Sequence, residues 1–560
     1  THEYAHIVSL QKSMKMGNKI PGAYFQFMGY EKEKRKDVLY GFPNSLVSYP
    51  IPGTVVPPWL AEGIAQYMYD GADWDHWDTH RDMILRDRAI NKNLLSFNEM
   101  NTFGKKGIGN ESTYNSGFAL SRYIVFKYGS DIIKDLMIEL SSPLQYSIND
   151  AFYNLLDIEG EEIYDDFVST LEERYNKLVS TIEVNHTNPI IIKDEGTANM
   201  FPVWAPDSNV FAYLSNKNND YFGQTDLFIH NLDNDVEQKI SGSVFSAPTW
   251  NPDGNIIYYS KKPKFPDKNG SRYYDIYEYD LSAKKEKRLT FGARSFSPVF
   301  IESDSSIAFL ATNDGSQDVY IYNIGQDKIT QITDIESRPI LSSLQYNYFD
   351  NSLYFDISFH HYRDIAKISL DDSTYKMVLN NDLWDERNIA FSKDGGLIYA
   401  DDKSGIFNLY MIDEKNGVQG YITNVFGGSF MPNINRDGRV LYSLYKDGGY
   451  KIAVIDTVKI IDDDLVGYSK TYYKKNENLS KPITFLDTTK SDKYVDQFPS
   501  MFIMPKLMYE YGTAKPGFYF YSSEILERLS LFGGMSLNSL MDTDLFFIFE
   551  FNRLYPTVFF

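Results

Sequence analysis

The chain has 560 residues, contains no cysteine and carries a formal net charge of −21. At roughly 100–200 residues per domain, this length predicts several domains. The lack of cysteine excludes a disulfide framework and any Cys-ligated metal site. The acidic excess disfavours nucleic-acid binding, which needs basic surfaces to displace counterions from phosphates. Aromatic residues make up 16% of the chain, which favours sizeable, strand-rich cores.

Residues 1 to about 182 have the apolar periodicity of helices. The segment from Trp59 to Met68 places Leu60 and Ile64 on one face, and Pro58 before it suits the first turn of a helix. Further helices are predicted by the same spacing at 115–128, 131–140 and 160–181. The first third of the chain is therefore predicted to be mainly α-helical.

The motif that carries chemistry lies at the start of the chain, in His2-Glu3-Tyr4-Ala5-His6. On a helix, residues i and i+4 share a face, so both imidazoles can reach one Zn²⁺ while the glutamate between them serves as a base. Two His ligands require a third. The best candidate is Glu62 in Trp59-Leu60-Ala61-Glu62-Gly63, which lies 62 − 6 = 56 positions after His6 on a separate predicted helix.

These motifs, H-E-x-x-H followed by W-L-x-E-G, resemble the hallmark of the gluzincin metallopeptidases over roughly residues 1–180. The resemblance implies a zinc site with the ligands His2, His6 and Glu62. It also implies that Glu3 is the general base and that a Tyr on a downstream helix stabilises the oxyanion, for which Tyr114 is the nearest match. The implied reaction is hydrolysis of a peptide or protein substrate by metal-activated water.

Each of these assignments has an alternative. The H-E-x-x-H motif could be coincidental or decayed on a structural helix, and Tyr114 is one of 44 tyrosines, most of which pack their rings in cores. His76 and His80 also have i, i+4 spacing. No Glu follows His76 directly, so for this pair we favour a helix face, or support for the helix that carries Glu62, over a metal site.

From about residue 195 the sequence changes to short strands separated by turns, with a period of 42 to 49 residues. Six segments of one type mark the period, at 226–232, 275–281, 318–324, 364–370, 408–413 and 450–455. Six repeats of about four strands predict a six-bladed β-propeller. Turns such as Pro248-Thr-Trp-Asn-Pro-Asp-Gly254 resemble those of TolB-like propellers. No catalytic constellation is visible in the repeats, so we expect them to dock a substrate or an envelope protein partner.

Residues 458–500 are polar and indicate a linker, and alternating strands return at about residue 501. In the segments 529–538 and 545–552, one face is almost wholly apolar or glycine. This pattern resembles the first strands of the barrels of outer-membrane surface-antigen proteins, the family of the BamA-like assembly factors. The alternative is a soluble β-hairpin domain that packs on the propeller.

The sequence therefore predicts a multidomain chain. We expect a mainly α, zincin-like peptidase domain at 1–190, a six-bladed TolB-like β-propeller at 191–457, a linker at 458–500 and the antiparallel strands of an incomplete barrel at 501–560. The peptidase domain is expected to be truncated at its N-terminus and the barrel at its C-terminus.

The expected function is zinc-dependent peptide-bond hydrolysis in a bacterial envelope protein. The soluble domains would face the periplasm, the last strands would contact the outer membrane, and nucleic acid is not an expected partner. The alternative is a non-catalytic envelope scaffold or outer-membrane assembly factor with a silent or structural zinc site.

Overall fold

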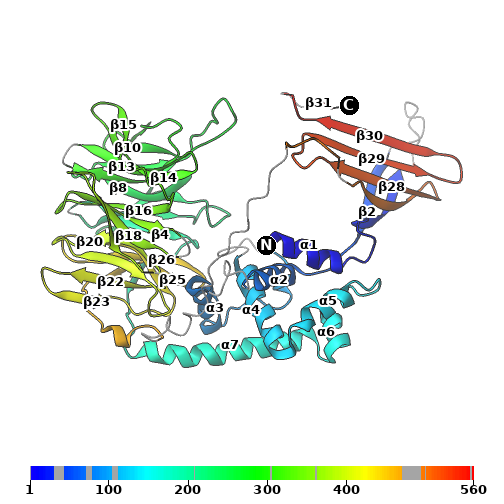
Figure 1. The fold of residues 1–560 in the computed structure, drawn as a ribbon, viewed down its shortest axis with the longest axis horizontal. Coiled ribbons are helices and arrows are strands. Elements are labelled where there is room, and N and C mark those ends of the chain that lie inside the picture. Colours follow the sequence, from blue (N-terminus) through cyan, green and yellow to red (C-terminus); the bar gives the residue numbers. More distant parts are fainter. Residues whose placement is uncertain are drawn as a thin grey trace.

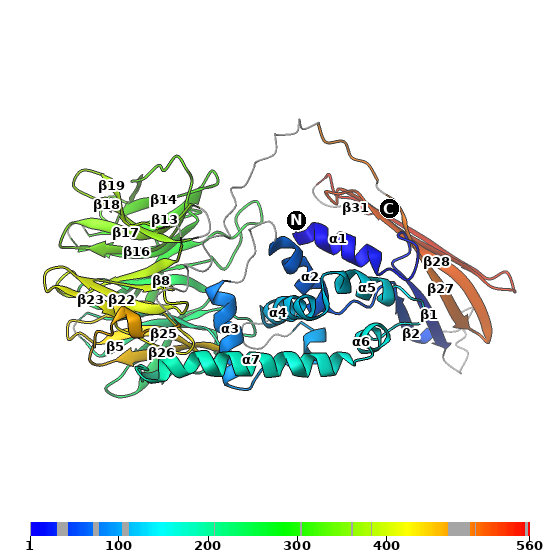
Figure 2. The same cartoon turned by 60° about the horizontal axis from the view of Figure 1, so that its bottom comes forward.

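The structure is a computed structural model. It describes the chain except residues 1, 31–42, 71–77, 104–110, 207, 303–304, 360–361, 382, 469–492, 499, 555–557 and 560. Figure 1 shows three parts: a body of helices, a ring of small sheets beside it, and a separate larger sheet. Figure 2 shows that the larger sheet is curved and that α7 runs along the base of the helical body towards the ring.

The helical body follows the predicted periodicity. Its described helices are α1 (His2–Lys12), α2 (Pro58–Asp70), α3 (Thr79–Ile90), the 3-10 turn η1 (Glu99–Asn101), α4 (Glu111–Tyr128), α5 (Asp131–Leu140), α6 (Ile148–Leu156) and α7 (Gly160–Glu183). The helices predicted after Pro58 and at 115–128, 131–140 and 160–181 are confirmed as α2, α4, α5 and α7. Their apolar faces meet in one core around Trp59, Leu136 and Phe152, all at most 1% exposed.

The predicted propeller is confirmed by six four-stranded sheets in the described residues. In chain order, the strands of the first three sheets are β4 (Asn199–Trp204), β5 (Val210–Ser215), β6 (Asp226–Asn231), β7 (Val236–Ser241), β8 (Val244–Trp250), β9 (Ile256–Lys261), β10 (Asp275–Asp280), β11 (Lys285–Arg288), β12 (Ser295–Ile301), β13 (Ser306–Asn313), β14 (Ser316–Asn323) and β15 (Lys328–Gln331). The strands that follow are β16 (Ile340–Asn347), β17 (Ser352–Ser358), β18 (Asp364–Ser369), β19 (Tyr375–Leu379), β20 (Glu386–Phe391), β21 (Leu397–Asp401), β22 (Asn408–Asp413), β23 (Val418–Tyr421), β24 (Gly428–Ile434), β25 (Val440–Lys446) and β26 (Gly449–Ile455).

The ring is closed in two ways. The first strands of neighbouring sheets, β4, β8, β12, β16, β20 and β24, contact each other in a complete circle. The short strand β3 (Ile190–Lys193), which enters from α7, pairs with β26 and completes the last blade. The six repeated segments predicted from the sequence are all third strands of their blades, from β6 to β26.

The third part is a seven-stranded sheet with the order β2-β1-β27-β28-β29-β30-β31. Its strands are β1 (Gly22–Tyr30), β2 (Pro43–Pro52), β27 (Phe502–Glu510), β28 (Thr513–Ser523), β29 (Leu529–Leu537), β30 (Thr543–Phe551) and β31 (Val558–Phe559). The alternating strands predicted after residue 501 are confirmed. The hairpin β1–β2 was not predicted, because the first third was expected to be mainly helical, and β1 joins β27 in parallel.

Arg86 on α3 fixes the helical body to the propeller. Its side chain is fully buried, pairs with Asp82 at 2.5 Å, and donates to the carbonyl oxygens of Phe426 at 2.6 Å and Gly427 at 2.7 Å. Because a buried guanidinium needs all its donors satisfied, this contact holds α3 against the loop before β24. After β26 the chain returns to the helical body through the 3-10 turn η3 (Asp463–Leu465), where Asn424 accepts from the backbone of Gly467 at 3.1 Å.

In the part of the chain that the structure describes, no helix combines the length and the apolar character needed to cross a membrane.

Candidate metal centre

Two candidate ligands lie on α1, as the H-E-x-x-H spacing predicts. The rings of His2 and His6 are one helical turn apart, with centroids 4.8 Å apart and planes at 83°. Their Nε2 atoms are 3.2 Å from each other. The i, i+4 spacing therefore points both nitrogens at one place.

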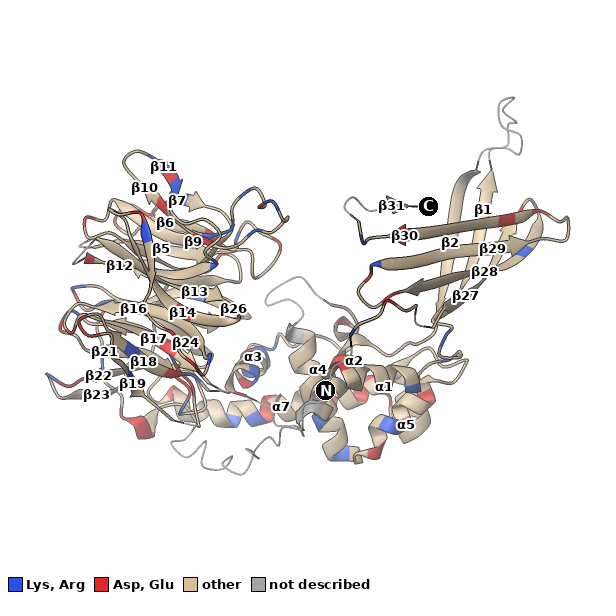
Figure 3. Cartoon of the chain, turned by 45° about the horizontal axis from the view of Figure 1, so that its top comes forward, with Lys and Arg blue, Asp and Glu red and all other residues tan. Residues whose placement is uncertain are grey.

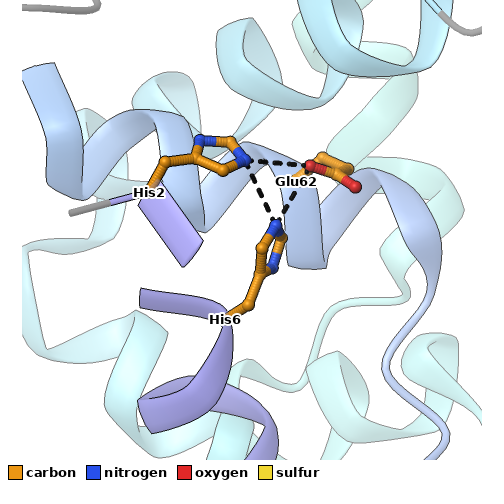
Figure 4. A group of neighbouring side chains, drawn as sticks. All are labelled: His2, His6 and Glu62. Atoms are coloured by element: carbon orange, nitrogen blue, oxygen red, sulfur yellow. Dashed lines mark hydrogen bonds and ion pairs between the residues drawn. The ribbon is translucent and has the colours of Figure 1, made fainter. Parts of the chain in front are cut away.

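The second motif brings the third candidate ligand to that place. Glu62 lies on α2, and its Oε2 is 3.3 Å from Nε2 of His2 and 3.2 Å from Nε2 of His6 (Figure 4). Among the described residues, this is the one group of three His, Asp or Glu side chains whose ligand atoms cluster. The structure thus brings together the three residues that the sequence assigns to the metal.

The three donor atoms fit a zinc ion in number, chemistry and spacing. Imidazole nitrogen and carboxylate oxygen bind zinc at about 2.0–2.2 Å, and a tetrahedron of that size separates its corners by roughly 3.3–3.6 Å. The observed edges of 3.2 to 3.3 Å lie at the short end of that separation. Two imidazole lone pairs and a carboxylate repel each other at this distance unless a proton or a cation lies between them.

The site is partly buried and keeps access to solvent. The side chains of His2, His6 and Glu62 are 25%, 18% and 13% exposed. Three protein ligands with such access are typical of a catalytic zinc site, in which water or substrate takes the fourth position. Glu3 follows His2 on α1 and is exposed.

A lysine after α1 anchors that helix, and the sequence analysis did not identify it. Within α1 only Ser9 is buried, so the helix has little core of its own. Lys15 Nζ donates to the carbonyl oxygens of Leu140 at 2.8 Å and Ser142 at 2.6 Å, and also to that of Gln145. Leu140 is the last residue of α5, where helical carbonyl oxygens lack partners and attract a cation, and the other two carbonyls lie in the loop that follows.

Two glycines allow α2 and α4 to pack closely beside Glu62. A Cβ on Gly63 would lie 2.3 Å from the carbonyl oxygen of Gly117, and a Cβ on Gly117 would lie 2.4 Å from that of Trp59. Any larger residue would therefore push the two helices apart and move the ligand Glu62. The signal in the sequence was a glycine inside each of two predicted helices, which usually has a packing reason.

The other sequence candidates lie elsewhere. Tyr114 is on α4, one turn before Gly117, with a partly buried ring 6.1 Å from that of Phe103, and its role at the oxyanion stays a prediction. His80 on α3 packs against the rings of Phe407 and Phe430, and burial lowers its pKa well below the usual value. His80 therefore lies on a helix, as expected, but its ring packs against the propeller, and position 76 lies outside the described residues.

Comparison with known proteins finds similarity to solved structures only. No family model matches the sequence, and no curated protein matches it. TolB from Acinetobacter baumannii is 16% identical with a TM-score of 0.31, over 48% of this chain and 56% of that one. The propeller domain of the Trilobed protease from Pyrococcus furiosus is 12% identical with a TM-score of 0.32, over 64% of this chain and 96% of that one.

An oligogalacturonate lyase from Vibrio parahaemolyticus is also similar, with 13% identity and a TM-score of 0.33, over 47% of this chain and 78% of that one. The chain spans little more than half the length of the TolB structure, at 56%. None of these similarities assigns a function to the chain.

Proposed function

We propose that this protein is a zinc-dependent peptidase of the gluzincin type. The observation that supports it is the triangle of His2, His6 and Glu62, with edges of 3.2 to 3.3 Å. When bound there, zinc supplies Lewis acidity that polarises a peptide carbonyl and makes water more acidic.

The protein's own residues would divide the remaining work. His2, His6 and Glu62 would hold the metal, and their partial exposure would give water or substrate access to it. The carboxylate of Glu3, next to His2 on α1, accepts the proton of the attacking water and then delivers it to the nitrogen of the leaving amine. Tyr114, on the helix packed against α2, would donate its hydroxyl hydrogen to the oxygen that becomes negative.

The first experiment measures zinc. We expect one zinc per chain by elemental analysis of the protein dialysed against zinc, and loss of that zinc in Glu62→Gln. Glu99→Gln is a suitable control because Glu99 lies on η1 and its carboxylate accepts only from Ser96 in the described contacts. Equal zinc content in the wild type and in Glu62→Gln would rule out the site.

The second experiment measures hydrolysis with a library of quenched fluorescent peptides. Replacing Glu3 with Gln removes the base but leaves the ligands, so we expect full zinc content with activity reduced by about 10²–10⁴-fold. Glu161→Gln, on α7, is the control. Unchanged hydrolysis in Glu3→Gln would refute the peptidase. Stoichiometric zinc without hydrolysis in the wild type would favour the scaffold with a structural zinc site.

Tyr114→Phe tests the oxyanion role. Loss of a donor to a developing oxyanion reduces kcat by about 10²–10³-fold while zinc binding is kept. Tyr153→Phe is the control, because Tyr153 is 53% exposed on α6. A kcat of Tyr114→Phe equal to that of the wild type would show that this hydroxyl has only a packing role.

We propose the cell envelope as the location, with the helical body and propeller in the periplasm and the strands after residue 500 at the outer membrane. The support is the face without a charged residue that β27 to β30 share, which is mostly apolar or glycine. The propeller would dock the substrate or a partner protein. Fractionation of cells that produce the protein tests this location, which recovery with the cytoplasmic fraction would contradict.

A further inference from the structure

The charges of the seven-stranded sheet are segregated to one face. Neighbouring positions along a strand face opposite sides, and paired positions face the same side. The six long strands carry the charged residues Lys506, Glu510, Lys515, Asp544 and Glu550. The register places all five on the same face. Lys506 and Asp544 belong to one row, which runs through Gly517 and Ser536. The other three charged residues lie an even number of positions from this row along their strands.

Part of this charged face forms a buried polar network around Lys515 and Glu510. Lys515 is 3% exposed and pairs with Glu510 at 2.6 Å and with Asp544 at 2.8 Å. Tyr30 on β1 donates to Glu510 at 3.0 Å, and Gln26 on the same strand accepts from the hydroxyl of Tyr519 at 2.9 Å. The polar side chains of the sheet are therefore turned towards each other, and the hairpin β1–β2 takes part in their network.

The opposite face has no charged residue and exposes large apolar side chains on every long strand. The residues with their exposed fractions are Val47 (60%), Tyr49 (69%), Phe25 (46%), Phe27 (44%), Leu507 (42%), Tyr509 (41%), Phe518 (39%), Met535 (41%), Leu545 (73%) and Phe547 (58%). In Figure 3 the strands of this sheet are tan over most of their length. The charged face also exposes apolar side chains, such as Leu46 (56%) and Ile548 (40%), so the two faces differ in charge: one holds all the charged residues of the long strands and the other holds none. An apolar surface of this width without a charge is unusual in contact with water.

The hairpin continues this apolar face without a break. Phe25 is paired with Tyr49 on β2 and with Leu507 on β27, so these three side chains form one row across the parallel junction. Phe27, Val47 and Tyr509 form the next row. The apolar face therefore extends from the C-terminal strands to the segment that follows the metal helix α1.

We propose that this face contacts the hydrocarbon of a lipid bilayer and that the hairpin β1–β2 is part of the contact. Hydrocarbon is the partner that matches a wide surface without a charge, and the long strands have 9 to 11 residues, the length that spans a bilayer core at the usual tilt. The inference rests on the proposed location of the C-terminal strands at the outer membrane and extends it to the N-terminal part of the chain.

The test uses flotation of the full chain with vesicles of phosphatidylethanolamine and phosphatidylglycerol in a density gradient. Val47 and Leu46 are neighbours on β2 with similar exposures of 60% and 56%, but they lie on opposite faces. We expect Val47→Glu to lower the floating fraction by at least about threefold, because a charge on a lipid-facing position is costly. Leu46→Glu should float like the wild type.

A second pair separates the hairpin from the C-terminal strands. Leu545 on β30 lies on the apolar face and Phe546 on the other. Loss of flotation in Leu545→Glu, with normal flotation in both Phe546→Glu and Val47→Glu, would overturn the inference about the hairpin and leave the proposed location intact. Absence of flotation in the wild type would overturn both.

Tryptophan fluorescence gives a reading that does not depend on a destabilising charge. In vesicles with brominated lipid tails, the added fluorescence of Val47→Trp should be quenched and that of Leu46→Trp should not. Equal quenching of the two would overturn the inference. One further result would overturn the inference: a dimer in lipid-free solution, detected by light scattering, that Val47→Glu dissociates without changing flotation. The apolar face would then bind a second copy of the chain.

Discussion

The residue Asp401, at the end of β21, is a buried acid in the propeller that has no cation among its described hydrogen-bond partners. It is 2% exposed and accepts from the hydroxyl of Tyr421 at 2.7 Å. Burial is the main cause that raises its pKa to about 8, and the charges of the neighbouring Asp402 and Glu386 act in the same direction. Burial likewise raises the pKa of Glu386 to about 7. Asp401 and Glu386 are therefore protonated in the folded protein at pH values where the unfolded chain has lost these protons.

This difference makes propeller stability depend on pH. Asp401 binds its proton more tightly folded than unfolded, so its contribution is complete below pH 4 and is lost as the pH rises towards 8. Between pH 5 and pH 9 we expect the melting temperature to fall by at least about 2–4 °C, the shift that roughly 1 kcal/mol gives in a domain of this size. Asp401→Asn should flatten the profile in scanning calorimetry, and Asp253→Asn, in an exposed turn, should not.

At the scale of elements, the position of α1 decides whether two of the three candidate metal ligands, His2 and His6, are in place. Lys15→Met removes the cation that joins this helix to the end of α5 and leaves the carbonyls of Leu140 and Ser142 without it. We expect zinc affinity to fall by about 10–100-fold, as for other groups that orient ligands. The measurement is competition with a zinc-binding dye.

Lys12→Met is the matched control, because Lys12 is an exposed residue in the last turn of the same helix. Lys15→Arg should restore part of the affinity, since a guanidinium can also donate to several carbonyls. Zinc affinity equal to that of the wild type in Lys15→Met would show that α1 is held without this contact.

The sequence predicted local patterns well and distant partners poorly. The ligands His2 and His6 are four positions apart on one helix, and each propeller blade repeats its own turns and strands, so both follow from short-range periodicity. The three carbonyls around Lys15 lie more than a hundred positions away, up to |i−j| = 130 for Gln145, and carbonyls have no residue type to recognise. The strands after residue 501 were predicted from their alternation, but the strand Gly22–Tyr30 and its pairing with β27 were not.

At the scale of the whole molecule, Arg86 couples the helical body to the propeller. Arg86→Met removes the counter-ion of Asp82, which is 1% exposed, and two hydrogen bonds to the loop before β24. Leaving a buried charge unpaired costs about 3–5 kcal/mol. We therefore expect the free energy of unfolding in urea to fall by that amount and trypsin cleavage near residue 190 to become faster.

Arg88→Met is the control for this prediction, because Arg88 lies on the same helix but donates to Asn93 in the adjoining loop. A urea transition of Arg86→Met that coincides with that of Arg88→Met would show that the two parts associate through other contacts.

The parallel pairing of β1 with β27 also has a consequence for synthesis. Tyr24 pairs with Lys506, which is 506 − 24 = 482 positions later. At roughly 5–20 residues per second, the ribosome needs about 24–96 s to produce that partner. During this interval one edge of an aromatic-rich hairpin has free backbone groups, and such an edge recruits strands of other chains. Expression of the intact protein should therefore depend on a chaperone that covers β1 until the last hundred residues have been made.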